Sequence, residues 1–295
     1  MPFIDSKGAR LYYEETGSGR PIVFVHEFGA DLRDWEPQLR WFAREYRCIA
    51  FNARGYPPSD VPESAELYGY EHSADDILAV LDGLGIDRAH IVGLSMGAYA
   101  TLQFGLRHPS RALSLVAAGV GSGAPREQRA LFKEQAEATA QRFLDEGSAA
   151  VAEEYALGAN RVQFLNKDPR GWQTFKERLA EHSAVGSAHT LRQYQAIRPS
   201  LYDYEKELAA LRLPILLIVG DEDEPCLDVN LFLKRAMPTA QLWMLPATGH
   251  AVNLEEPAAF NAGVQAFLSA VDRDCWRPRD PRASGSDALP MGKRG

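Results

Sequence analysis

Short apolar runs alternate along the chain with amphipathic segments, and this pattern predicts an α/β fold. Two strands are expected first, at 10–17 and 21–28, separated by the turn GSGRP. Further strands are predicted at 47–55, 89–95, 112–121, 214–220 and 240–246, and helices at 35–45, 73–85, 96–108, 231–238 and 255–271. Ser73 is the expected cap of its helix. Such alternation implies a mostly parallel sheet covered on both faces.

The alternation is interrupted between about Gly121 and Leu213, where strand-like runs give way to helical spacing. We therefore predict an α/β core formed by 1–121 and 213–271, and a helical cap formed by 122–212. The last residues, 272–295, are rich in Pro, Gly, Ser and charge, and are expected to form a flexible tail.

Composition and charge exclude several classes of partner. The 295 residues include 32 Lys and Arg against 40 Asp and Glu, a net charge of −8 without a basic cluster, so neither nucleic acid nor a membrane is an expected partner. The chain opens without a leader pattern and has no apolar run long enough to span a bilayer, which favours a cytoplasmic protein. Its 3 cysteines lack metal-ligand spacing and are expected to be free thiols, with no metal bound.

The stretch GLSMG places Ser95 between an apolar strand and the helix that follows it. A serine on so sharp a turn takes a strained conformation and needs small neighbours, which Gly93 and Gly97 provide. The turn would expose the hydroxyl beside a helix N-terminus, where developing negative charge is favoured. The alternative is that Ser95 is an ordinary helix cap.

A serine nucleophile needs a histidine base and a carboxylate that orients it. His250 follows a predicted strand and precedes the last helix, so its side chain can turn back over the sheet edge. The segment VGDEDEP supplies the acid after another strand, and Asp223, deeper in the loop, is preferred over Asp221. The chain order Ser95, Asp223, His250 is that of the α/β-hydrolases.

These residues together resemble the α/β-hydrolase superfamily from about Arg10 to Val271. The resemblance implies an eight-stranded, mostly parallel sheet with a helical cap inserted after the sixth strand. It also implies an oxyanion hole formed by the backbone N–H groups of Met96 and Phe28. Glu27 departs from the pattern, because a glycine is usual there. Its carboxylate either bonds to a neighbouring segment or acts as a tuned acid, and His26, Arg54 and Ser59 are expected to brace the loop.

The resemblance and the serine at the elbow predict a cofactor-independent hydrolase that cleaves a small ester or lactone through an acyl-enzyme. Family members that displace a leaving group from a saturated carbon have an aspartate nucleophile at the position of Ser95. One alternative is a carbon–carbon bond hydrolase acting on a diketone, although the glycine-rich loop after His26 that such enzymes tend to show is absent. Another alternative, of a different class, is a non-catalytic ligand receptor on the same fold.

The cap is expected to determine specificity for a small-molecule carbonyl substrate. The substrate pocket is predicted to include Glu27, Trp172 and Tyr194, with Tyr202 and Phe164 as further apolar candidates. Arg161 or Arg198 could hold a substrate carboxylate. A homodimer is among the assemblies left open.

Overall fold

A computed structural model of the chain describes residues 2–284 and contains one sheet of 8 strands in the order β1-β2-β4-β3-β5-β6-β7-β8. The strands are β1 Phe3–Ser6, β2 Ala9–Thr16, β3 Arg20–Val25, β4 Tyr46–Phe51, β5 Ala89–Leu94, β6 Ala112–Ala118, β7 Ile215–Gly220 and β8 Ala240–Leu245. β2 pairs antiparallel with both β1 and β4, and the pairs from β4 through β8 are all parallel. The predicted fold class is confirmed.

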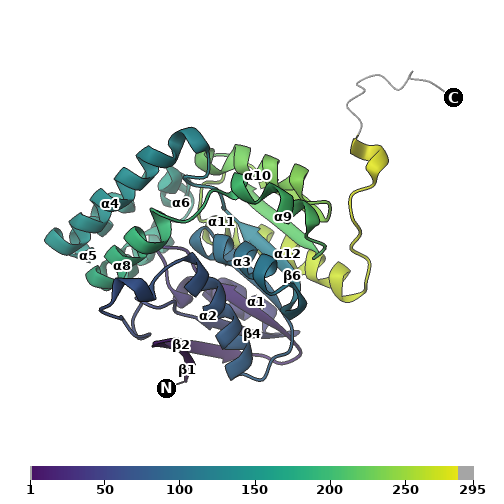
Figure 1. The fold of residues 1–295 in the computed structure, drawn as a ribbon, viewed down its shortest axis with the longest axis horizontal. Helices are drawn as coiled ribbons and strands as arrows, with labels where there is room; N and C mark the ends of the chain where they lie inside the picture. The colour runs from purple at the N-terminus through teal and green to yellow at the C-terminus, as the bar shows by residue number, and fades with distance from the viewer. Residues whose placement is uncertain (1, 285–295) are drawn as a thin grey trace.

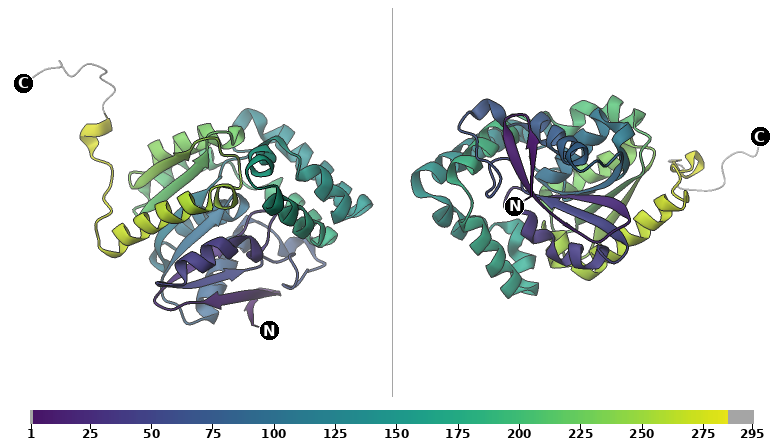
Figure 2. Two further views of the ribbon diagram at one scale, coloured as in Figure 1. Left: turned by 180° about the vertical axis from the view of Figure 1, so that it is seen from behind. Right: turned by 90° about the horizontal axis from the view of Figure 1, so that it is seen from below.

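Alternate side chains of each central strand enter two separate cores, because successive residues of a strand point to opposite faces. Val23 and Val25 of β3 join the core under α2 (Tyr70–Gly83) and α3 (Met96–Arg107), whereas Ile22 and Phe24 join the core under α1 (Glu36–Phe42) and α12 (Pro257–Asp272). Figure 1 shows α2 and α3 in front of the sheet, and α12 lies in front after the half-turn of Figure 2. Every residue of β5 and β7 is buried, as expected for parallel strands covered on both faces.

The chain between β6 and β7 is helical. Its helices are α4 Arg129–Glu146, α5 Ser148–Tyr155, α6 Val162–Lys167, α7 Pro169–Ala180, α8 Ala184–Thr190 and α9 Glu205–Ala210, with a π-helical turn at Leu191–Gln195. Of these, α4, α5, α6 and α8 gather on the left of Figure 1. The insertion therefore follows the sixth strand, as predicted from the resemblance. The division at 122 and 212 stays a prediction.

The last part of the core contains α10 (Glu224–Ala236), α11 (Val252–Glu255) and α12. After α12, Trp276 donates a hydrogen bond to the carbonyl of Thr239 over 3.0 Å and packs edge-on against Phe267. The segment predicted as a flexible tail thus has specific contacts at its start, and residues 285–295 of that prediction lie outside the described residues. None of the helices within 2–284 has the length and apolar character needed to cross a membrane.

Two local predictions differ from the structure. The four-residue strand β1 has no counterpart among the predicted strands, because a run as short as FIDS carries almost no periodic signal. Ser73 does not cap α2: the helix begins at Tyr70, after Gly69 with φ 145°, and has no side-chain cap. The tertiary contacts of Tyr70 extend the helix by one turn beyond the capping signal.

The N-terminus of α3 approaches the end of β3 so closely that only glycine fits between them. A Cβ on Gly97 would lie 2.1 Å from the carbonyl oxygen of Val25, and one on Gly93 would lie 2.3 Å from the carbonyl oxygen of Gly97. The predicted need for glycine on both sides of Ser95 is confirmed. This close approach fixes the start of α3 beside the loop that follows β3.

Gly97→Ala should therefore destabilise the protein far more than Gly105→Ala in the same helix. The methyl group added at Gly105 would meet the end of the Leu115 side chain, which can move, whereas the one added at Gly97 would meet backbone. We expect Gly97→Ala to lose at least about 3 kcal/mol more than Gly105→Ala in urea unfolding. Equal stability of the two variants would contradict the close packing.

Candidate active site

Ser95 lies at the junction of β5 and α3 in a backbone conformation that non-glycine residues rarely adopt. Its φ of 54° and ψ of −111° are strained, and its N–H donates to the carbonyl of Ala118 over 2.8 Å. The neighbouring strand thus holds the residue on the turn. The strain presents the serine hydroxyl at the carboxyl edge of the sheet, as expected for a nucleophile elbow.

His250 and Asp223 form a buried hydrogen-bonded pair at the same edge. His250 Nδ1 lies 2.7 Å from Asp223 Oδ2, and both side chains are buried. Burial opposes the charged imidazole, but Asp223 overcomes that effect and raises the pKa of His250 well above its ordinary value. The exposed Asp221 instead accepts the N–H of Thr248, so it shapes the loop that carries His250.

Ser95 and His250 line one cavity of about 230 Å³ between the core and the cap. Phe28 lines it from the core, and Asn160, Tyr155 and Arg198 line it from the cap. Within the described residues, no hydrogen bond joins the Ser95 hydroxyl to the imidazole. Such contacts are often loose before substrate binds.

The two predicted oxyanion donors are each held by a buried tyrosine. Tyr56 donates its hydroxyl to the carbonyl of Phe28 over 3.0 Å, and Tyr194 donates to the carbonyl of Met96 over 2.8 Å. Met96 is the first residue of α3, so its N–H has no partner within the helix. No sequence signal connects Tyr56 with this loop, because the contact depends on the turn after β4.

Glu27 forms a buried ion pair with Arg161 across the junction of core and cap. Arg161 Nη1 donates to Glu27 Oε1 over 2.8 Å, and Nη2 contacts Oε2. Burial alone would raise the pKa of Glu27, but Arg161 outweighs it and keeps the side chain a carboxylate. Glu27 Oε2 also lies 3.8 Å from His250 Nε2. The carboxylate therefore faces the side of the imidazole that a base must turn toward the serine.

The histidine before Glu27 braces the same loop. His26 Nε2 accepts the N–H of Ala53 over 3.0 Å, and Nδ1 lies 2.7 Å from the carbonyl of Glu27, which together require the neutral ring with its proton on Nδ1. Burial lowers the pKa of His26, in agreement with that form. Ser59 donates to the carbonyl of Asn52, whose side chain accepts the N–H of Leu32 beyond the loop.

Arg54 does not brace this loop. Its guanidinium binds the Asp76 carboxylate of α2 and the carbonyls of Ser6 and Leu67. The expected role of Arg54 is therefore corrected: the side chain ties β1 and α2 together, because the turn after β4 directs it away from Phe28.

The predicted pocket residues are not in the cavity wall. Glu27 is paired behind it with Arg161, Trp172 donates to the carbonyl of Ala156 inside the cap, and Tyr194 lies behind Met96. These predictions are wrong because each side chain is bonded elsewhere: Glu27 to Arg161, Trp172 within the cap, and Tyr194 to Met96 of the core. The further apolar candidates, Phe164 and Tyr202, also lie outside the cavity wall: Phe164 packs on Phe175, and Tyr202 packs on Phe232.

Cys226 lies next to the pair of His250 and Asp223, which sequence reasoning missed. It is one helical turn beyond Asp223, and that spacing could have signalled it. Burial raises the pKa of the Cys226 thiol, so it stays protonated. In the described part of the chain, Asp223, Cys226 and His250 place one ligand atom each within 4.8 Å of the others. A metal ion there would have to replace the hydrogen bond that orients the imidazole.

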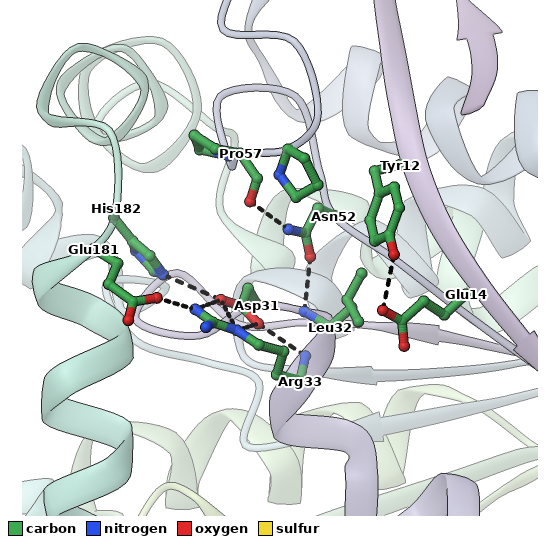
Figure 3. Close-up of a pocket in the computed structure, with 10 residues that line it drawn as sticks. Tyr12, Glu14, Asp31, Leu32, Arg33, Asn52, Pro57, Glu181 and His182 are labelled. Atoms are coloured by element: carbon green, nitrogen blue, oxygen red, sulfur yellow. Dashed lines mark hydrogen bonds and ion pairs between the residues drawn. The ribbon is translucent and has the colours of Figure 1, made fainter. Parts of the chain in front are cut away.

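A second cavity, of about 410 Å³, lies on the other side of the loop that follows β3 (Figure 3). Arg33 crosses it, binding Asp31 of the core and Glu181 of the cap. Burial lowers the pKa of His182 there to about 4, so the imidazole is neutral. The described residues that line this cavity include no serine, threonine or cysteine, and two of its carboxylates, Asp31 and Glu181, are paired with Arg33.

Comparison with known proteins places the chain in a family. The family described as "alpha/beta hydrolase fold" matches residues 20–257. The chain belongs to this family and is an α/β-hydrolase enzyme.

Individual relatives are similar over nearly their whole length. The chain is 26% identical to 3-oxoadipate enol-lactonase 1 of Acinetobacter baylyi, with 85% of this chain and 89% of the relative covered. It is 28% identical to 2-hydroxy-6-oxo-6-phenylhexa-2,4-dienoate hydrolase of Burkholderia cepacia, with 90% and 94% covered. A solved thermophilic esterase from Thermogutta terrifontis, with malate bound, has a TM-score of 0.80 at 25% identity and covers 92% of this chain and 98% of its own.

Glu27→Gln should move the acid limb of the pH profile of kcat/KM to lower pH. Removing a carboxylate 3.8 Å from Nε2 destabilises the imidazolium, so the pKa of His250 falls and the base form persists in more acidic solution. The other groups around the ring, which are Asp223, Cys226 and the loop-binding Glu255, are unchanged. We expect a shift of about 1–3 pH units with a neutral ester substrate.

The matched control is Glu181→Gln, which removes a cap carboxylate paired with Arg33 on the other side of the loop. Its acid limb should coincide with that of the unmodified enzyme. An acid limb that stays in place, or moves to higher pH, in Glu27→Gln would show that Glu27 does not act on His250.

Proposed function

We propose that the protein is a serine hydrolase that cleaves a small ester or lactone through an acyl-enzyme. The observation that carries this proposal is that Ser95, held on a strained elbow, opens onto the same cavity as the buried pair of His250 and Asp223. That combination supplies an exposed hydroxyl, a base and an orienting acid. The similarity to proteins named as an enol-lactonase and an esterase supports the same reaction class.

In the proposed reaction, Ser95 attacks the carbonyl carbon and passes its proton to His250. Asp223 holds the imidazole through Nδ1 and stabilises the imidazolium that forms. The N–H groups of Phe28 and Met96 bind the oxyanion. His250 then returns the proton to the leaving alcohol as the ester bond breaks. In the second half of the reaction His250 takes a proton from a water molecule that attacks the acyl carbon, and returns it to the Ser95 oxygen as the product acid leaves. Protein groups supply every step, so no cofactor is required.

The size of the cavity favours a small substrate. Its volume of about 230 Å³ lies below the roughly 300–1,000 Å³ of pockets that take drug-sized ligands. The bulky residues Phe132, Tyr155 and Leu191 of the cap restrict it further. A short acyl chain or a small lactone ring fits this space better than an extended one.

Carbon–carbon bond cleavage is the second candidate, favoured by the similarity to the dienoate hydrolase. That reaction requires ketonisation of the substrate before the bond breaks, and hence a proton donor near the vinylogous ketone. The third hypothesis is a receptor that only binds its ligand. Such a protein would retain the same residues without catalysing turnover. A panel of esters, lactones and diketones separates the three.

A fluorophosphonate probe should label the protein, and Ser95→Ala should abolish the label. The probe forms a covalent bond only with a serine whose proton is removed by a nearby base. Ser122, which lines the same cavity, supplies the control: Ser122→Ala should still be labelled. Labelling that survives in Ser95→Ala would assign the nucleophile elsewhere.

Asp223→Asn should reduce kcat by up to about 10⁴-fold, because the amide stabilises the wrong tautomer of His250 and cannot stabilise the imidazolium. Asp221→Asn, two residues away, should remain within about tenfold of the unmodified enzyme, since Asp221 bonds only to the His250 loop. Steady-state hydrolysis of p-nitrophenyl acetate measures both. A larger loss in Asp221→Asn would reverse the assignment of the acid.

A further inference from the structure

The catalytic cavity contains a buried cation that the described residues do not neutralise. Arg198 is only 6% exposed and lines the cavity together with Ser95 and His250. Within residues 2–284, no carboxylate lies within the 4.0 Å of an ion pair with its guanidinium. A buried charge without a partner is unfavourable by several kcal/mol, so proteins seldom retain one without a use.

Arg161 and Arg198 differ in how their charges are balanced. Both arginines are buried in the cap, but Arg161 is matched by the Glu27 carboxylate. Arg198 has instead one hydrogen bond to the carbonyl of Ser122, over 2.8 Å, and three aromatic rings around it. The nearest ring is Tyr99, with its centroid 4.8 Å away.

These contacts hold the guanidinium in place without neutralising its charge. Cation–π contacts and one neutral carbonyl recover part of the lost hydration, and burial still lowers the pKa of Arg198. Arg129 adds to the positive field, because its guanidinium donates to the carbonyls of Gly123 and of Arg198 itself. A rigid, positively charged wall therefore lies in the same small space as the nucleophile.

We infer that the substrate of the proposed hydrolase carries a carboxylate, which Arg198 binds while the reacting carbonyl lies at Ser95. The planar guanidinium fork matches a carboxylate, and the small cavity suits a short ester or lactone with one free acid group. This inference rests on the proposed function for the reacting bond, and on Arg198 alone for the charge of the substrate.

The test compares esters that differ only in charge. Monomethyl succinate and monomethyl glutarate are measured against methyl butyrate and methyl pentanoate by acid release. The unmodified enzyme should prefer the anionic members in kcat/KM. Arg198→Gln should lower that preference by about 10–100-fold, the usual range for a hydrogen bond to a charged group, because the anionic esters lose much more kcat/KM than the neutral ones.

Arg192→Gln is the matched control, because Arg192 lies on the π-helical turn Leu191–Gln195 that precedes Arg198 and bonds to Gln141 on the exposed side. It should keep the full anionic preference. Arg198→Lys retains the charge but not the planar guanidinium fork. Its preference for anionic esters should lie between those of the unmodified enzyme and Arg198→Gln. An enzyme that prefers neutral esters, or an Arg198→Gln variant that loses both classes equally, would overturn the inference.

A binding measurement keeps this inference separate from the proposed reaction. In Ser95→Ala, glutarate should raise the melting temperature, and the additional change Arg198→Gln should remove that shift. If no ester is cleaved but glutarate still binds through Arg198, the reaction is wrong and the anion site stands. If neutral esters are cleaved but glutarate does not bind, or inorganic phosphate alone binds, the reaction stands and the carboxylate site is wrong.

Discussion

The site depends on the close approach between the first turn of α3 and the end of β3. Gly97 permits a backbone contact that no side chain could share, and this contact fixes where α3 begins. Ser95 is thereby forced onto a strained turn with φ 54°, and its position relative to the Phe28 loop is set. The rigid sheet supplies the strain, so the nucleophile is positioned before any substrate binds.

Charged pairs, rather than an apolar interface alone, join the cap to this edge of the core. Arg161 pairs with Glu27, Arg178 with Asp34, and Arg33 bridges Asp31 to Glu181. Removing one partner of a buried pair leaves an unpaired charge, which is strongly unfavourable. The buried pairs therefore favour one position of the cap on the core. Because Glu27 also faces His250, the ion pair that positions the cap also affects the protonation of the catalytic imidazole.

Much of the core could be predicted from the sequence, because buried parallel strands give strong apolar runs. The residues Ser95, Asp223 and His250 could be placed at one edge because each follows a strand, and parallel strands end on the same side. The preference for Asp223 over Asp221 agrees with the hydrogen bond to His250.

The cap was less predictable, since its helices have polar and apolar residues on faces whose partners the sequence does not reveal. Trp172 and Tyr194 looked suited to a pocket, yet both are used in packing and in support of Met96. Glu27 could be recognised as unusual, but its partner Arg161 is 134 positions away in the chain. Long-range charge pairing of this kind becomes visible only in three dimensions.

The central claim, that Ser95 becomes acylated, is tested most directly by rapid quenching of the enzyme with p-nitrophenyl acetate and mass spectrometry of its peptides. The account predicts that the peptide containing Ser95 gains one acetyl group within the first turnover and loses it as the product acid appears. Product release in the first turnover with Ser95 unmodified, or with the acetyl group on another residue, would contradict it.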